Sequence, residues 1–278
     1  MKKFPKIGLV VEGNITHSAL LRMPKLGDDL GPVKSASVRV ARRVSNFLKA
    51  GHAVAAYEEM QAAQLILLRV PDDAVSRIVE EIFAADLVLK EVSFVLCESW
   101  LTMEALAPLR LRGASVGTVL PVPSSRRDWF VVEGDSLAVR YIKRFLEMND
   151  SRALELRPGG KPFYFAAELL STALPVPILL AAQSALRGSG VTGNNLYTLL
   201  NEMTQSMVRD ILKGARANWT GPLAHCAPKT ASDHVEALRR TDPQLADYIV
   251  QHVESARARM DKGKTASAPP AENIGLSV

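Results

Sequence analysis

The chain has 278 residues, which is long for one ordinary domain and sufficient for two domains that each bury a core. Hydrophobic residues make up 47% of the sequence and charged residues 23%, a balance typical of a folded globular protein rather than a disordered one. The formal net charge of +5 is compatible with phosphorylated small molecules as ligands. No Lys/Arg run alternates with stacking aromatic residues, so the composition argues against nucleic acid as a partner.

Cysteine content and hydropathy bear on the compartment. Two cysteines, Cys97 and Cys226, cannot form a disulfide framework, and no secretory signal precedes the first apolar run. We therefore expect a cytoplasmic protein. The uncharged stretch 169–186 approaches the length of a membrane span, but Pro175 and Pro177 interrupt it. We interpret this stretch as a kinked, buried core helix and expect no membrane partner.

In the first half of the chain, short β-branched runs alternate with amphipathic stretches. This alternation is typical of βαβ units and a mostly parallel sheet covered by helices on both faces. The predicted helices cover Val38–Ala50, Asp73–Phe83, Thr102–Arg112 and Ser136–Met148. The predicted strands cover Ile7–Val11, Ala53–Tyr57, Leu65–Val70, Phe94–Cys97, Ser115–Leu120 and Trp129–Val132.

Past Arg157-Pro158-Gly159-Gly160 the strand pattern ends, and the remaining periodicity is helical. We predict helices at about 163–187, 194–213, 230–240 and 243–261. The fold class is therefore an α/β, Rossmann-like, doubly wound parallel sheet in residues 1–158, followed by an all-α domain in residues 159–261. The small, polar residues 262–278 are expected to form a disordered tail.

The first strand ends in a partial dinucleotide-binding fingerprint. Glycines are expected at positions 11, 13 and 16, and only Gly13 is present, beside Asn14, Ile15 and Thr16. Gly13 can let the backbone approach a pyrophosphate, or it can simply end the strand in a turn. The residues leave both interpretations open.

An insertion of about 18–36 is predicted between this turn and the next helix, because the helical pattern starts only near Ser37. The end of the insertion places Ser35, Ser37 and Arg39 at a helix N-terminus, a favourable site for an anion. Alternatively, one serine only caps the helix and the cations face water.

The choice between NAD and NADP is open in the sequence. A carboxylate after the second strand would hold the adenosine ribose of NAD, and Glu58 and Glu59 follow the predicted second strand. Either glutamate could equally be a solvated loop charge.

Several stretches resemble a group of uncharacterised Rossmann-like oxidoreductases related to pyrroline-5-carboxylate reductase and ketopantoate reductase. The resemblance spans most of residues 5–255, in order, without one decisive motif. It rests on Leu65–Ala74, Cys97–Leu101, Leu106–Arg110, Gly113-Ala114, Tyr164–Ala167, Thr220–Ala224 and His234–Leu238.

This resemblance implies a Rossmann domain followed by a helical domain like that of 6-phosphogluconate dehydrogenase, through which such proteins commonly form homodimers. A small-molecule substrate would lie in the cleft between the domains. The implied cofactor contacts are Gly13, Asn14, Thr16, Val70, Pro71, Glu98 and Ser99.

The sequence departs from the family pattern where chemistry is expected. Leu120-Pro121 replaces a His-Pro, Tyr164-Phe165 replaces a Tyr-His, and Ala173 replaces an Asn. His225-Cys226-Ala227 stands where an Arg-Gly-Asp-like stretch is expected. Acid–base catalysis needs a titratable group within reach of the substrate, and these groups are lost.

The remaining candidates for proton transfer are Lys161, Tyr164 and Glu168, which lie together at the start of one helix. A salt bridge and packing would explain the same residues. Metal binding is not expected, because the adjacent His225 and Cys226 lack a second pair of ligands.

Two functions follow as hypotheses. The first is an NAD(P)-dependent oxidoreductase acting on a small carbonyl or imine substrate, with NADP or NAD as cofactor. The second is a catalytically inactive, dimeric sensor that binds a nucleotide or metabolite.

Overall fold

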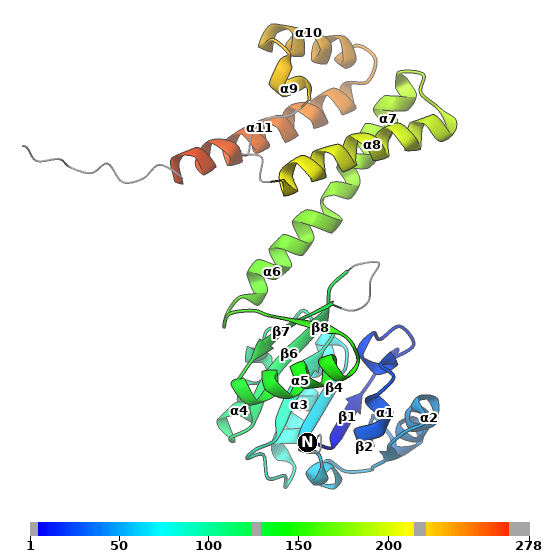
Figure 1. The fold of residues 1–278 in the computed structure, drawn as a ribbon, viewed down its shortest axis with the longest axis vertical. Helices are drawn as coiled ribbons and strands as arrows, with labels where there is room; N and C mark the ends of the chain where they lie inside the picture. Colours follow the sequence, from blue (N-terminus) through cyan, green and yellow to red (C-terminus); the bar gives the residue numbers. More distant parts are fainter. Residues whose placement is uncertain (1–4, 124–128, 214–220, 267–278) are drawn as a thin grey trace, which may run out of the picture. The chain divides into compact units, whose positions relative to one another are not determined.

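The computed structural model describes residues 5–123, 129–213 and 221–266 and consists of two compact units (Figure 1). The first unit ends at Glu168 and the second begins at Leu169. The boundary lies later than the expected residue 158 because helix α6 (Lys161–Glu168) begins with a side chain buried in the first unit, that of Lys161.

The first unit is built on an eight-stranded sheet with the strand order β3-β2-β1-β4-β5-β6-β7-β8. Neighbouring strands are parallel except for the antiparallel pair β6 and β7. This is the doubly wound order 3-2-1-4-5-6 extended by two strands, so the predicted doubly wound class is confirmed. The strands are β1 (Ile7–Val11), β2 (Leu30–Lys34), β3 (His52–Ala53), β4 (Leu65–Arg69), β5 (Ser93–Cys97), β6 (Ser115–Pro121), β7 (Trp129–Gly134) and β8 (Arg152–Glu155).

Helices cover both faces of the sheet, which explains why the central strands are apolar at nearly every position. Helices α2 (Val38–Leu48) and α5 (Ser136–Met148) contribute buried residues to the core on one face. Helices α3 (Val75–Ala84) and α4 (Ala107–Leu111) contribute to the core on the other. Each buried Leu, Ile or Phe contributes about 1.5–3 kcal/mol of hydrophobic free energy, so these two layers fix the sheet.

The predicted insertion at 18–36 is wrong, because residues 30–34 form the second strand of the sheet. Leu30–Lys34 (β2) pairs with β1 on one side and β3 on the other. The Gly31-Pro32 pair hides the strand from a pattern search, since glycine and proline are both depleted in strands. The register between β1 and β2 is irregular near Ile7, as expected beside a proline that cannot donate to the ladder.

The segment between β1 and β2 contains only short helical turns. A 3₁₀ turn covers Leu20–Arg22, and α1 covers Leu26–Asp29. A dinucleotide-binding unit normally places a full helix here. The buried side chains of Leu20, Leu21 and Leu26 pack on the sheet in its place.

Two further strands differ from the predictions. The predicted strand Ala53–Tyr57 is the two-residue edge strand β3 (His52–Ala53), followed by a 3₁₀ turn over Glu58–Ala62. Strand β8 (Arg152–Glu155) was not predicted, because three of its four residues are exposed and its pattern lacks an apolar run.

The second unit is helical, as predicted. A π-helical turn over Leu169–Ala173 leads into α7, and α11 continues to Ala266, past the predicted end at 261. The tail prediction for residues 267–278 lies outside the described residues. The helices are α7 (Pro175–Gly188), α8 (Gly193–Leu212), α9 (Pro222–His225), α10 (Pro228–Arg239) and α11 (Pro243–Ala266).

The helical run Lys161–Gly188 is long and apolar enough to cross a membrane, by length and composition. We expected residues 169–186 to form a buried core helix, and this is wrong for the single chain: α7 has no buried residue. Its apolar side chains point outward instead, including Val176, Ile178 and Leu180.

Candidate active site

The predicted cofactor residues gather at one edge of the sheet, here called the carboxyl edge, where the parallel strands β1, β2, β4, β5 and β6 end (Figure 1). In open α/β sheets, ligands bind at this edge. Topology therefore brings together residues that are up to 155 positions apart in the sequence, from Gly13 to Glu168.

The turn after β1 requires a glycine. Gly13 has a φ of +74°, in the left-handed region that side chains disfavour. A Cβ at this position would lie 3.2 Å from Cγ of Pro71, which follows β4. The side chain of Asn14 tightens the turn, because its Oδ1 accepts a hydrogen bond from the Thr16 amide at 2.8 Å. Ile15 packs against the core below.

Glu98 holds the rest of this loop. One carboxylate oxygen, Oε1, accepts hydrogen bonds from the Ser18 hydroxyl at 2.8 Å and from the Leu20 amide at 3.0 Å. The other, Oε2, forms an ion pair with Nε of Arg69 at 2.7 Å. Glu98 itself has a φ of +56°, a strained conformation for a side-chain-bearing residue. One carboxylate thus joins the ends of β1, β4 and β5.

A cavity of about 480 Å³ opens beside this ion pair, within the first unit. It combines the two paired charges with the indole of Trp100 and an apolar wall. Its lining residues are His17, Ala19, Arg69, Glu98, Trp100, Leu120, Pro121, Val122, Pro123 and Glu168. Leu120-Pro121, where the resemblance implies a His-Pro, is therefore part of the cavity wall.

Ser35, Ser37 and Arg39 lie at the end of β2, next to the turn after β1. The buried Ser35 hydroxyl donates to the carbonyl of Val11 at 2.6 Å. Ser37 is the N-cap of α2, where its Oγ accepts from the Val40 amide at 3.3 Å, and Arg39 is exposed in the first turn. The capping role is confirmed, and the Ser37 hydroxyl proton is still available to donate to an anion.

Glu58 and Glu59 do not follow the second strand of the sheet; they follow β3, at its outer edge. Oε1 of Glu59 accepts hydrogen bonds from the amides of Ala55 and Ala56, and these bonds lower the pKa of its carboxyl. Oε1 of Glu58 accepts from the Asp86 amide at 3.3 Å. Both carboxylates hold local structure, so the suggested ribose contact is not supported.

Val70, Ser99 and Lys161 are buried below the surface of the edge. The Lys161 ammonium donates to the carbonyls of Ser99 at 2.8 Å and Leu101 at 2.5 Å. Burial lowers the pKa of Lys161 to about 8. With both contacts made to backbone, Lys161 anchors the start of α6 under the loop after β5 rather than facing the cavity.

Three aromatic rings, those of Trp100, Tyr164 and Phe165, pack together at the start of α6. Trp100 stacks on Tyr164 with ring centroids 6.2 Å apart, and meets Phe165 edge-on at 5.1 Å. Burial and the neighbouring carboxylate of Glu168 raise the pKa of Tyr164, so its phenol stays protonated at neutral pH. Of the predicted catalytic residues, Glu168 lines the cavity, and Tyr164, one helical turn before it, stacks on Trp100, which also lines the cavity.

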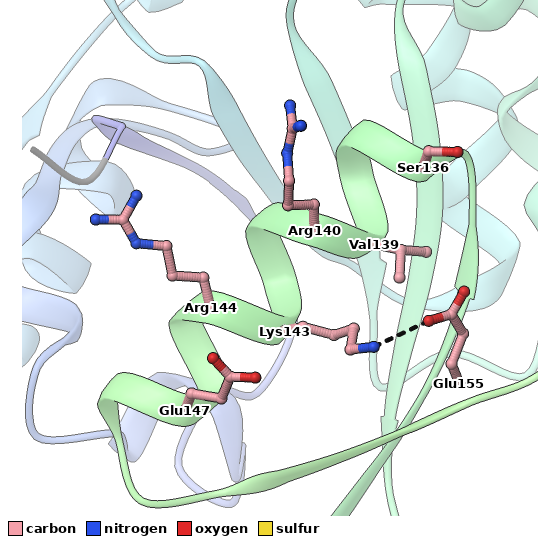
Figure 2. Close-up of a pocket in the computed structure, with 7 residues that line it drawn as sticks. All are labelled: Ser136, Val139, Arg140, Lys143, Arg144, Glu147 and Glu155. Atoms are coloured by element: carbon pink, nitrogen blue, oxygen red, sulfur yellow. Dashed lines mark hydrogen bonds and ion pairs between the residues drawn. The ribbon is translucent and has the colours of Figure 1, made fainter. Parts of the chain in front are cut away.

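A separate hollow of about 420 Å³ lies along α5 (Figure 2). In Figure 2, Lys143 reaches across to Glu155, with which it forms an ion pair at 3.0 Å, while Arg140 and Arg144 extend away from that pair. None of the sequence-predicted residues lines it, so we place the candidate active site at the carboxyl edge.

Sequence reasoning missed Arg69, Ser18 and Trp100. Arg69 carried a detectable signal, because it is the single ionisable residue that ends an otherwise apolar strand, Leu65–Leu68. Ser18 gave no such signal: its contact with Glu98 joins residues 80 positions apart.

Comparison with known proteins places the chain structurally. Residues 129–253 match the family model of a domain of unknown function, DUF2520. No curated protein matches the chain in sequence.

Solved structures match over nearly the whole chain. The imine reductase of Aspergillus terreus is 13% identical, with a TM-score of 0.68 over 98% of this chain and 99% of that one. The imine reductase of Myxococcus stipitatus in complex with NADP+ is 14% identical, with a TM-score of 0.65 over 92% and 95%. The pyrroline-5-carboxylate reductase of Coxiella burnetii is 12% identical, with a TM-score of 0.56 over 96% and 100%. The chain therefore has the fold of the Rossmann-like reductases, and the predicted resemblance is confirmed for the fold.

The lowered pKa of Lys161 predicts a specific pH dependence of stability. Between pH 8 and the ordinary lysine value of 10.5, the unfolded chain binds more protons than the folded one, so the free energy of unfolding rises with pH across this window. Relative to Lys161→Met, the wild-type protein should gain up to about 3 kcal/mol between these limits, at about 1.4 kcal/mol per unit. Denaturant unfolding of both proteins across the window measures this, and a constant difference would contradict it.

Proposed function

We propose that the protein is a cytoplasmic, NADP(H)-dependent reductase of a small carbonyl or imine compound. Three features support this: the Rossmann-like reductase fold, the glycine turn after β1, and a cavity at the carboxyl edge whose Trp100 stacks on the protonated Tyr164 ring. The solved relatives named imine reductases make C=N reduction the first reaction to test.

The end of β2 carries the preference for NADP over NAD. A carboxylate here would hold the ribose hydroxyls of NAD, whereas an arginine suits the 2′-phosphate of NADP. Residues 34–43 contain no acid, and they present Ser37 and Arg39 at the N-terminus of α2 with Lys34 just before them. The helix dipole adds to the attraction for a phosphate.

Replacing Arg39 with alanine should therefore weaken NADPH binding by about 10- to 100-fold, since a charge-assisted hydrogen bond contributes about 1.5–3 kcal/mol. NADH binding should change little, because NADH lacks the 2′-phosphate. Isothermal titration calorimetry with both cofactors measures the difference.

Lys90→Ala is the matched control, since it removes one exposed cation before β5, at the opposite edge of the sheet. An equal loss of NADPH affinity in Arg39→Ala and Lys90→Ala would show that Arg39 acts only through the net charge of the protein. An equal loss for NADH and NADPH would argue against a 2′-phosphate site.

Reduction also needs a proton donor. Bound NADPH would supply the hydride to the substrate carbon, and the nitrogen or oxygen of the reduced double bond must gain a proton. The Tyr164 hydroxyl is suited to this, because Trp100 holds its ring and Glu168, which lines the cavity, lies one turn away. Lys161 would act as a positioning residue, because its bond to the Ser99 carbonyl fixes the start of α6.

Tyr164→Phe keeps the aromatic ring and removes the phenolic hydroxyl that would donate the proton. In steady-state assays with NADPH and a panel of cyclic imines and small ketones, kcat should fall by about 10²–10⁴-fold. The dissociation constant for NADPH should stay within about twofold. Tyr141→Phe on α5 serves as the control for loss of a hydroxyl elsewhere, and an unchanged kcat in Tyr164→Phe would remove Tyr164 from the mechanism.

The alternative function, an inactive binding protein, is favoured by one observation. Two ionisable groups at the edge, Glu98 and Lys161, are engaged in bonds within the protein and offer little acid–base chemistry. NADPH binding by the wild-type protein without turnover of any substrate in the panel would favour this alternative.

We also propose that two copies associate through the helical unit. Its exposed apolar side chains include Leu170, Leu174, Val176, Leu180 and Ile211, and apolar surface left exposed in this way favours an interaction site.

Leu180→Glu should convert a dimer into monomers in sedimentation-velocity experiments, because it places a charge on the proposed contact. Leu111→Glu, at an even more exposed leucine of the first unit, should leave the mass unchanged. A wild-type protein that is monomeric at micromolar concentration would contradict the proposal.

A further inference from the structure

The ion pair between Arg69 and Glu98 is an unusual feature of the cavity. It joins the end of one central strand to the end of the next, and both side chains line the cavity. The exposed fractions of the side chains are 21% for Arg69 and 10% for Glu98, so the pair is largely shielded from water. Charges in such a place act more strongly on a ligand than charges on the open surface.

Glu98 does more than form one ion pair. Its other oxygen receives the Ser18 hydroxyl and the Leu20 amide, so both oxygens are held in place. The carboxylate cannot swing away from Arg69 without breaking these bonds. The guanidinium, for its part, has five N–H donors, and Glu98 engages the one on Nε.

We infer that Glu98 determines which charge the cavity accepts. With Glu98 ionised, the charge of Arg69 is balanced within the protein, and the cavity favours a substrate whose group beside the pair is uncharged or cationic. A carboxylate or phosphate at the same position would meet the fixed negative charge of Glu98 together with Arg69. Without that negative charge, Arg69 would present a fork that matches a carboxylate.

This inference deepens the proposed function by naming the charge class of the substrate, and for that it rests on the proposed reaction. The charge preference itself is a binding property. It can be measured on the full-length protein without cofactor and without turnover.

The first test is the binding of oxalate, measured by calorimetry at low salt. Glu98→Gln should bind oxalate at least tenfold more tightly than the wild-type protein, since removing the carboxylate leaves Arg69 uncompensated. The double variant Glu98→Gln/Arg69→Gln should lose this gain. Equal oxalate affinity in the wild type and Glu98→Gln would overturn the inference, and so would a gain that persists in the double variant.

The reverse variant guards against a folding failure of Glu98→Gln. Arg69→Gln leaves Glu98 as the uncompensated charge, so it should bind ethylammonium at least tenfold more tightly than the wild type and show no gain for oxalate. Thermal unfolding establishes that each variant is folded before titration. No gain for ethylammonium in a folded Arg69→Gln protein would likewise overturn the inference.

The outcomes separate this inference from the proposed function. If the wild-type protein binds no NADPH while both charge swaps behave as expected, the reductase proposal fails and the cavity preference stands. If NADPH binds and is turned over while the charge swaps have no effect, the preference fails alone.

Discussion

The carboxylate of Glu98 is the contact on which the candidate site depends. Where a full helix would follow β1 in a dinucleotide-binding unit, this chain has a loop, a 3₁₀ turn and the one-turn helix α1, whose buried leucines pack on the sheet. Glu98 adds a polar restraint through Ser18 and Leu20, and the same carboxylate forms an ion pair with Arg69. One side chain therefore shapes both the loop beside Gly13 and the charge of the cavity, so the proposed cofactor site and the proposed substrate site share one contact.

A second set of buried contacts fixes the start of α6 beneath Trp100. Lys161 joins α6 to the carbonyls of Ser99 and Leu101, and the Glu133 carboxylate accepts a bond from the Gly160 amide at 3.1 Å. These buried contacts fix the residues on either side of Trp100 and the first turn of α6. The stacked pair of Trp100 and Tyr164 is therefore held on both sides by buried contacts, as the proposed role of Tyr164 in proton transfer requires.

Much of the fold could be predicted because its central strands are apolar at nearly every position and its helices carry strong periodicity. Strands β1, β4, β5 and β6 and helix α5 lie where the sequence placed them. Strand β2 was missed because Gly31 and Pro32 interrupt its pattern. As a result, this strand was interpreted as an insertion, and the expected ribose contact was assigned to Glu58 and Glu59. The site residues that were found, such as Gly13 and Ser37, follow local turn and cap rules. Ser18 depends on a contact with Glu98, 80 positions away in the sequence, and local patterns carry no record of such contacts.

The incomplete glycine fingerprint gains a physical explanation from this arrangement. The third glycine of the motif serves close packing between the helix and the strand, and here no full helix follows β1, so an exposed Thr16 meets no such constraint. The first position, Val11, is buried within β1 and paired with Arg69, and it belongs to the strand rather than to the turn. The second glycine serves the close approach of backbone and pyrophosphate, and Gly13 retains both that position and the left-handed conformation. The missing helix therefore accounts for Thr16, and the place of Val11 in the strand accounts for the first position; neither departure argues against a nucleotide at the turn that remains.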